Sequence, residues 1–158
     1  MKESMRLYPP VFAFSRRVLA VTTIGGFHIP ARSAVIMSQW VVHRDPRWWP
    51  DPDQFRPERW LNGNDTKSPA QSPSKGPAYA YFPFGGGPRI CIGNQFAMLE
   101  AILAVAIIAP RFRFELIEPQ KVRPWPSVTL RPAAGGIPAI IHRRQPAAAP
   151  VAAQTRSI

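Results

Sequence analysis

Proline constrains the folding of this chain more than any other residue type, because 20 of its 158 residues are proline. Proline has no backbone N–H and interrupts helices and central strands, so few long helices are expected. Hydrophobic residues make up 46% of the chain and charged residues 18%, a balance typical of globular proteins rather than disordered ones. The composition therefore predicts a globular chain rich in turns and short extended segments.

The chain is strongly basic, with 20 Lys and Arg against 9 Asp and Glu and a formal net charge of +11. Such a charge attracts anionic partners, but internal ion pairs, propionate groups and nucleic acid explain an arginine-rich composition equally well. The single cysteine, Cys91, rules out an internal disulfide and with it a secreted scaffold held together by disulfides. The sequence contains neither a signal peptide nor an apolar stretch of about 20 residues, so we expect a cytoplasmic location and no membrane span.

The first 60 residues contain short apolar runs separated by turn residues, a pattern typical of small antiparallel sheets. The pair Gly25-Gly26 favours a hairpin turn, and Arg44 to Trp60 has a period of neither 2 nor 3.6, which indicates an irregular packed meander. The other expected elements are the last turns of a helix at Lys2 to Leu7, extended runs at Val18 to Ile24, Phe27 to Pro30 and Ala34 to Met37, and a short helix at Ser38 to His43.

The second half of the chain is predicted to contain one long helix, Asn94 to Ala109. Glu100 is its only charged residue and apolar residues occupy every face, so we expect this helix to be buried in the core. Arg111 to Glu115 alternates as an edge strand does. Composition and turn residues predict an exposed loop at Asn62 to Ala78, a hairpin of Val128 to Arg131 with Ala139 to His142 around Gly135-Gly136, and a disordered tail from Gln145 to Ile158.

The segment from Phe82 to Gly93, FPFGGGPRICIG, carries the strongest indication of chemistry. Its glycines allow the backbone to bend tightly and to turn N–H groups toward a sulfur or an anion. Cys91 would lie at the positive end of the predicted helix and beside Arg89, where the thiolate form is favoured over the thiol. A lone cysteine is usually a small buried residue, but a thiolate presented by a tight loop is suited to ligating iron.

Five residues of this segment, Phe84, Gly87, Arg89, Cys91 and Gly93, stand at the spacing F-x-x-G-x-R-x-C-x-G. With this motif the sequence resembles the cytochrome P450 family, whose haem-binding signature has the same spacing. Three further stretches resemble family motifs in the same order along the chain: E-x-x-R at Glu3 to Arg6, HRDP at His43 to Pro46, and F-x-P-E-R-W at Phe55 to Trp60.

The resemblance implies an α+β, mainly helical fold, of which residues 1–144 would form the C-terminal part: a small β-sheet, the meander, the cysteine loop and the buried helix. Nothing in the sequence resembles the long distal helix or the N-terminal half of the family. The chain is therefore expected to be part of a longer enzyme, beginning within the E-x-x-R helix. Glu3, Arg6 and Arg59 are expected to form a buried ion-pair triad that holds the meander, the alternative for Glu3 and Arg6 being an ordinary helix pair.

The implied cofactor is haem b. The residues that the resemblance assigns to haem are the axial ligand Cys91, Arg89 and Arg16 at the propionates, Phe84 near the thiolate, and Gly87 and Gly93 in the loop. For Arg16 the alternative is a solvated strand residue. Two apolar segments, Val11 to Phe14 and Thr129 to Ala133, would line a pocket for a lipophilic substrate.

The implied activity is that of a monooxygenase, which inserts one oxygen atom of O₂ into an organic, lipophilic substrate with electrons from a reductase or ferredoxin. A non-catalytic haem-binding protein and a basic nucleic-acid-binding protein are the alternatives. The tryptophans lie beside prolines and aspartates rather than among arginines, which argues against nucleic acid. His28, His43, His142 and Cys91 lack the paired spacing of zinc sites, and the glycines are not followed by the lysine of a phosphate loop.

Overall fold

The computed structural model describes residues 1–61, 79–133 and 136–145. The helices are α1 (Lys2–Leu7), α2 (Gln39–Val42) and α3 (Asn94–Ile108), and the 3₁₀ helices are η1 (Pro57–Trp60), η2 (Gly87–Arg89) and η3 (Pro119–Lys121). The strands are β1 (Phe14–Arg17), β2 (Thr22–Ile24), β3 (Phe27–Ile29), β4 (Ala34–Met37), β5 (Phe112–Leu116), β6 (Pro124–Pro126), β7 (Leu130–Pro132) and β8 (Ala139–Arg143). The whole of the predicted exposed loop and all of the predicted tail except Gln145 lie outside the described residues.

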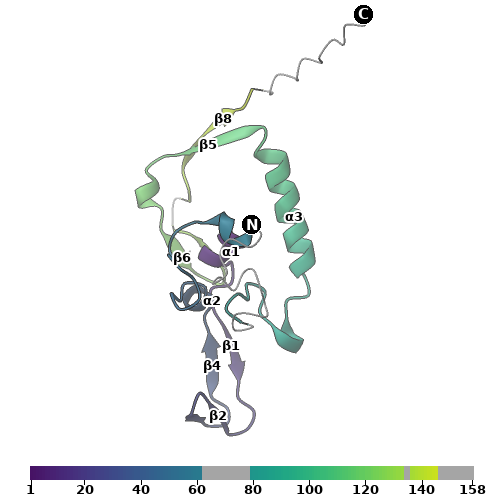
Figure 1. Ribbon diagram of the computed structural model, residues 1–158, viewed down its shortest axis with the longest axis vertical. Coiled ribbons are helices and arrows are strands. Elements are labelled where there is room, and N and C mark those ends of the chain that lie inside the picture. The colour runs from purple at the N-terminus through teal and green to yellow at the C-terminus, as the bar shows by residue number, and fades with distance from the viewer. Residues whose placement is uncertain (62–78, 134–135, 146–158) are drawn as a thin grey trace, which may run out of the picture.

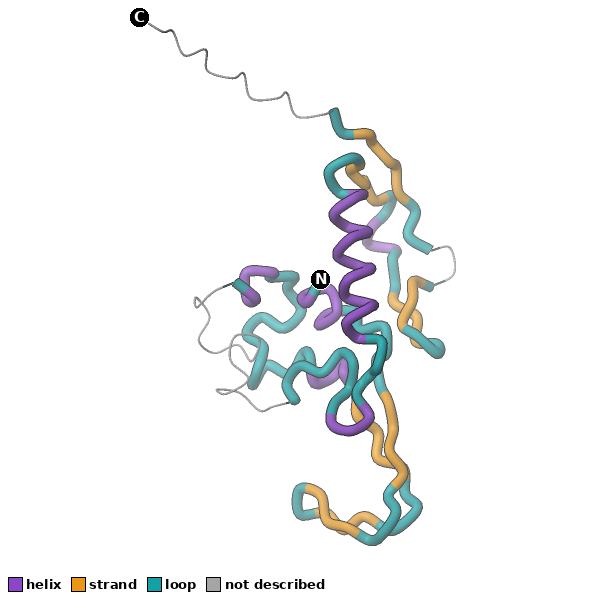
Figure 2. Tube along the Cα trace, turned by 90° about the vertical axis from the view of Figure 1, so that its right-hand side faces the viewer, coloured by secondary structure: helices purple, strands orange, loops and turns teal. Residues whose placement is uncertain are grey.

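The elements are arranged around a small centre that contains α1, α2 and the meander (Figure 1). The β1–β4 ladder extends from this centre as an arm that ends in β2 and β3, while β5 and β8 lie at the opposite end of the molecule. Helix α3 stands to one side of the centre in Figure 1 and leads from the cysteine loop to β5. In the turned view, it lies between the compact centre and the C-terminal strands (Figure 2). The cysteine loop therefore joins the compact centre to the long helix.

The first four strands form two antiparallel ladders, and one of them confirms the predicted hairpin at Gly25-Gly26. β2 pairs with β3 across this turn, where the two glycines have φ of 58° and 86°, a conformation that strains other residues. β1 pairs with β4, with Phe14 opposite Met37 at one end. The expectation that the first strand begins at Val18 is wrong. The four residues of β4 pair with the four residues of β1. Val18 follows this ladder, where its N–H donates to the Ser33 carbonyl at 2.9 Å and its carbonyl accepts from the Arg32 N–H at 2.7 Å.

The C-terminal strands pair differently from the single late hairpin that the sequence predicted. β5 pairs with β8, and β6 pairs with β7 across a short turn, so Val128 to Arg131 does not pair with Ala139 to His142. A short link between β6 and β7 closes with little loss of chain entropy, which leaves β8 free to match the full length of β5. The edge strand predicted at Arg111 to Glu115 is confirmed as β5, shifted by one residue.

The buried core is small and contains many polar side chains. Among the described residues, the buried apolar side chains are Leu7, Pro9, Trp49, Ala80 and Phe82, and the buried polar ones are Glu3, Arg6, Gln39, His43 and Arg59. Aromatic rings gather around Trp49, with the ring centroids of Trp60 and Tyr81 at 5.8 and 6.2 Å. The core therefore lies where α1 and the meander meet the start of the cysteine loop.

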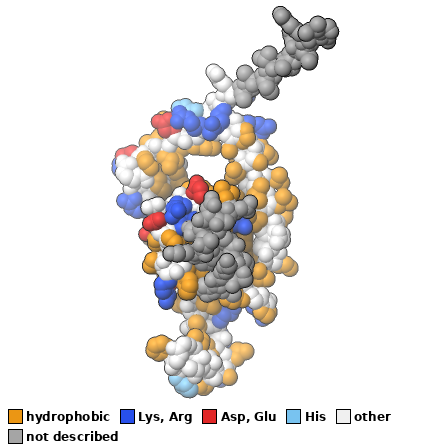
Figure 3. Space-filling view, viewed as in Figure 1, with side chains coloured by type: hydrophobic (Ala, Val, Ile, Leu, Met, Phe, Trp, Pro, Cys, Tyr) orange, Lys and Arg blue, Asp and Glu red, His pale blue; other side chains and the backbone are white. Residues whose placement is uncertain are grey.

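Helix α3 has the predicted position and length, but the expectation that it is buried is wrong for this chain. Phe96 is 72% exposed and Leu99 58% exposed, and no residue of α3 is buried. The space-filling view shows apolar side chains along the surface of this helix (Figure 3). Apolar residues on every face lead to burial only where other elements cover the helix, and the described residues do not cover it.

Within the described ranges, no helix combines the length and the hydropathy that are needed to cross a bilayer.

Candidate functional site

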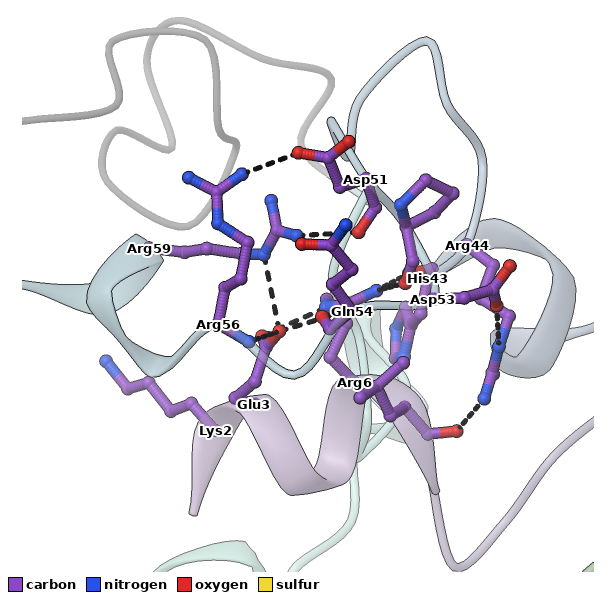
Figure 4. Close-up of polar contacts among 12 residues, drawn as sticks. Lys2, Glu3, Arg6, His43, Arg44, Asp51, Asp53, Gln54, Arg56 and Arg59 are labelled. Carbon is purple, nitrogen blue, oxygen red and sulfur yellow. Dashed lines mark hydrogen bonds and ion pairs between the residues drawn. The ribbon is translucent and has the colours of Figure 1, made fainter. Parts of the chain in front are cut away.

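Buried charges at the start of the chain form a compact network around Glu3 (Figure 4). Glu3 and Arg6 lie three residues apart on α1, and Arg59 reaches them from η1. Arg6 Nη2 donates to Glu3 Oε1 at 2.8 Å, and Arg59 Nε donates to the same oxygen at 3.3 Å. The three side chains are at most 1% exposed. The structure thus brings together the three residues expected to form an ion-pair triad.

Two further donors to Glu3 were not identified from the sequence. The backbone N–H of Arg56 donates to Glu3 Oε1 at 3.0 Å, and the indole Nε1 of Trp60 donates to Oε2 at 2.9 Å. Trp60 ends the F-x-P-E-R-W motif and carries an N–H that a phenylalanine at this position would lack. This difference could have identified Trp60 as a donor. Burial alone would raise the pKa of Glu3, but the hydrogen bonds from Arg6, Arg56 and Trp60 lower it to about 2. Glu3 is therefore a carboxylate at neutral pH.

Arg6 also ties α1 to the meander through backbone carbonyls. Its Nη1 donates to the carbonyl oxygens of His43 at 2.8 Å and Pro52 at 2.6 Å, and its Nη2 donates to that of Gln54 at 3.1 Å. The guanidinium also lies 5.2 Å from the centre of the Trp49 ring. Since the meander has little regular secondary structure, its carbonyls need such partners. The network thus replaces a backbone ladder in holding the meander against α1.

Two buried side chains fix the start of the cysteine loop. His43 Nε2 accepts a hydrogen bond from the N–H of Phe82 at 2.9 Å, and Trp49 Nε1 donates to the carbonyl of Ala80 at 3.2 Å. His43 is fully buried, at 0% exposure, and burial is the main cause that lowers its pKa to about 4. His43 is therefore neutral at pH 7, as its role as an acceptor requires.

Acidification should destabilise the chain through His43 before most carboxylates titrate. The unfolded chain binds a proton at His43 near pH 6.5, whereas the folded chain binds it only near pH 4. The contribution of neutral His43 to the free energy of unfolding is therefore complete above pH 6.5 and is lost as the pH falls toward 4. Between about pH 7 and about pH 5, the free energy of unfolding measured in urea should fall by about 2 kcal/mol.

The substitution His43→Gln keeps a hydrogen-bond acceptor but cannot titrate, so it should remove most of this pH dependence. His28 lies exposed on β3, and His28→Gln is the matched control that should keep the dependence. A slope that survives in His43→Gln would show that another group causes the acid sensitivity.

The cysteine loop is a tight turn closed by a backbone hydrogen bond. The N–H of Cys91 donates to the carbonyl of Phe84 at 2.9 Å. Gly85 and Gly87 have φ of +75° and +67°, which glycine adopts without strain. η2 lies inside this turn, and α3 begins at Asn94. The loop therefore presents Cys91 just ahead of the long helix, and Cys91 is exposed in this chain.

A cavity of about 470 Å³ gathers most of the residues that the sequence assigned to a cofactor. It is lined by Arg16 from β1, by Phe84, Arg89 and Cys91 from the loop, and by residues of α3. The Arg16 guanidinium lies 4.8 Å from the centre of the Phe14 ring, which also lines the cavity.

The two loop glycines and the late apolar segment lie outside this lining. Gly93 adjoins Cys91, and a Cβ at Gly93 would lie 3.9 Å from the Cys91 sulfur. Gly87 contributes to the turn of the loop through its left-handed backbone. Of the segment expected to line a substrate pocket, Leu130 to Pro132 borders a separate cavity of about 450 Å³. The structure therefore does not bring Thr129 to Ala133 to the cavity of Cys91.

The side chains of the Cys91 cavity suit a flat apolar group that carries a metal and anionic substituents. The thiol offers a soft metal ligand, the two guanidinium groups match carboxylates, and the rest of the wall is mostly apolar. Across residues 1–61, 79–133 and 136–145, no three or more His, Cys, Asp or Glu are grouped so that they could hold a metal ion. His43 bonds to the Phe82 amide, and His142 lies 3.0 Å from Glu115, so the histidines serve separate parts of the fold.

Comparison with known proteins gives the family of this chain. The family profile described as cytochrome P450 matches residues 1–136. The chain belongs to the cytochrome P450 family. The family resemblance inferred from the motifs is therefore confirmed, and P450 proteins bind haem b. The thiol, the two arginines and the apolar wall of the Cys91 cavity fit that cofactor.

Curated P450 relatives come from bacteria and plants. Cyclooctatin synthase of Streptomyces melanosporofaciens is 44% identical over 128 residues, which are 81% of this chain and 26% of that enzyme. Cytochrome P450 72A397 of Kalopanax septemlobus is 41% identical over 134 residues, which are 84% of this chain and 24% of that protein. The chain thus spans about a quarter of the length of these relatives.

Solved P450 structures share the fold. The retinoic-acid-bound cyanobacterial CYP120A1 matches with a TM-score of 0.78 and 31% identity, covering 90% of this chain and 31% of that one. The haem domain of cytochrome P450DA matches with a TM-score of 0.76 and 30% identity, covering 92% of this chain and 30% of that one. The α+β fold class, as the C-terminal part of the P450 fold, is therefore confirmed.

Proposed function

We propose that this chain carries the cysteine-ligand side of a haem-thiolate monooxygenase, with Cys91 as the axial ligand of the haem iron. The observation that carries the proposal is the cavity in which Cys91, Arg89, Arg16 and Phe84 meet. When bound, haem supplies the chemistry for inserting one oxygen atom of O₂ into an organic substrate, with electrons from a reductase or ferredoxin.

The residues of the chain have separate tasks in this proposal. The Cys91 thiolate would ligate the metal and would donate electron density to it, which favours oxygen activation. Phe84 lines the cavity beside the sulfur, and Arg16 and Arg89 would bind the two carboxylates of the cofactor. Gly93 adjoins Cys91, where a Cβ would make only an ordinary contact with the sulfur, so this chain gives Gly93 no further role. The Glu3 network acts at a distance from these groups by holding the meander, whose Trp49 bonds to Ala80 just ahead of the loop.

A lipophilic substrate and an acidic electron donor fit the same proposal. Val11 and Phe14 give the cavity apolar walls, and the structural neighbour CYP120A1 holds retinoic acid, a lipophilic compound. The net charge of +11 favours an acidic electron-transfer protein. The cytoplasmic location stays a prediction.

Haem titration of the purified chain, followed by absorbance, tests whether this cavity binds the cofactor. Replacing Arg16 with Gln removes one guanidinium from a carboxylate of haem. Because a charge-assisted hydrogen bond contributes about 1.5 kcal/mol, Arg16→Gln should weaken haem binding about tenfold.

Arg17 provides the matched control because it follows Arg16 on β1, is exposed and lies on the opposite face of the ladder. Arg17→Gln makes the same change in charge and should leave the haem affinity unchanged. Equal weakening by the two substitutions would assign the effect to net charge alone. Failure of the unaltered chain to bind haem would refute the proposed function.

A further inference from the structure

The three consecutive glycines of the cysteine loop are needed for two different reasons. Gly85 and Gly87 adopt left-handed backbone angles, but Gly86 has φ of −168° and ψ of 171°, an extended conformation that any residue adopts. Space is what restricts Gly86. A Cβ there would overlap Cε1 of Tyr79 and would lie 3.2 Å from both Cδ1 and Cζ of the same ring. The Tyr79 ring therefore packs directly against the backbone of the loop.

Tyr79 also links the loop to the buried core. Its ring centroid lies 6.4 Å from that of Phe82 in an edge-to-face arrangement, and Phe82 packs in the same way on His43 at 5.2 Å. Tyr79 and Gly86 line one cavity of about 690 Å³ on the side of the loop that faces β1 and β4. Tyr79 is 57% exposed, so its ring can leave the loop if a side chain at position 86 displaces it.

We infer that Tyr79 is a positioning residue for Cys91 and acts through Gly86. Gly86 lies inside the segment that is closed by the hydrogen bond from the Cys91 N–H to the Phe84 carbonyl. A ring packed on Gly86 restricts the movement of this segment, and with it the movement of the Cys91 sulfur and the Arg89 side chain. The inference rests on the proposed function, because it assigns Tyr79 to the same haem site.

Hydrogen exchange in the chain without haem measures this restraint separately from cofactor binding. Tyr79→Ala removes the ring, and Gly86→Ala pushes it away from the loop. Each substitution should speed exchange of the Cys91 amide about 3- to 10-fold, the loss expected for one aromatic packing contact. The double variant should exchange no faster than either single variant, because both remove the same contact.

Two further variants separate the ring contact from general effects. Tyr79→Phe keeps the ring and should exchange like the unaltered chain. Phe27 is an exposed aromatic residue on β3, at 75% exposure, and Phe27→Ala should leave the Cys91 amide unaffected. Additive effects of Tyr79→Ala and Gly86→Ala, or an unchanged Cys91 amide in Tyr79→Ala, would overturn the inference.

The haem-bound chain supplies the second measurement. The thiolate-type absorption band of the reduced carbon monoxide complex should form a smaller share of the total haem in Tyr79→Ala and an unchanged share in Tyr79→Phe. Faster exchange in Tyr79→Ala together with no thiolate band in the unaltered chain would uphold the positioning role and refute the proposed function. A normal band in the unaltered chain, with no effect of Tyr79→Ala on the band or on exchange, would refute the positioning role and uphold the proposed function.

Discussion

Replacing Glu3 with Gln should destabilise the chain by about 3 to 5 kcal/mol, the typical cost of leaving a buried charge without its partner. Gln has nearly the same size as Glu and can still accept hydrogen bonds, but it cannot neutralise the guanidinium groups of Arg6 and Arg59, both 0% exposed. Single domains are stable by only about 5 to 15 kcal/mol, so such a loss is severe in a chain with so small a core. Urea unfolding followed by tryptophan fluorescence measures the change, since Trp49 and Trp60 adjoin the network.

Glu58 is the matched control, because it lies on η1 next to Arg59 but is exposed. Glu58→Gln should change the free energy of unfolding by less than about 0.5 kcal/mol. The pKa of Glu3 falls from 4.5 to about 2 on folding, so its contribution is complete above pH 4.5 and is lost as the pH falls toward 2. In Glu3→Gln the free energy of unfolding should therefore also depend less on pH between about 4.5 and 2. Equal destabilisation by the two substitutions would contradict the role of the Glu3 network.

Residues whose chemistry depends on local spacing were predictable from the sequence. Glu3 and Arg6 stand one helical turn apart, so their contact follows from the spacing alone once the helix forms. The Gly25-Gly26 turn also follows from local backbone preference. The contact of Arg59 with Glu3 and the approach of Arg16 to the cavity cross long stretches of chain, and only the family resemblance indicated them.

Features that depend on packing between distant segments were not predictable. The pattern of α3 indicates an apolar helix but does not say whether other elements cover it, and in this chain they do not. Strand pairing near the C-terminus depends on which of several short segments match best over their full length, and the sequence favoured the wrong pair. The packing of Tyr79 on Gly86 leaves no periodic signal in the sequence. A run of glycines looks the same whether glycine is needed for a left-handed backbone or for lack of space for a side chain.

Replacing Cys91 with Ala should abolish the thiolate-type spectrum of the haem-bound chain. Cys91 is the only cysteine of the chain, so no other thiolate can take its place on the iron. Arg16, Arg89 and the apolar wall of the cavity remain in this variant, and haem should therefore still bind, with weaker affinity and a different axial ligand. Ile92 is fully exposed next to Cys91, and Ile92→Ala is the matched truncation that should keep the spectrum.

The absorption spectrum of the reduced, carbon-monoxide-bound haem complex tests directly whether Cys91 ligates the iron. The expected result is a thiolate-type band in the unaltered chain and in Ile92→Ala, and no such band in Cys91→Ala. The same band in Cys91→Ala, or its absence from an unaltered chain that has bound haem, would contradict the assignment of Cys91 as the ligand.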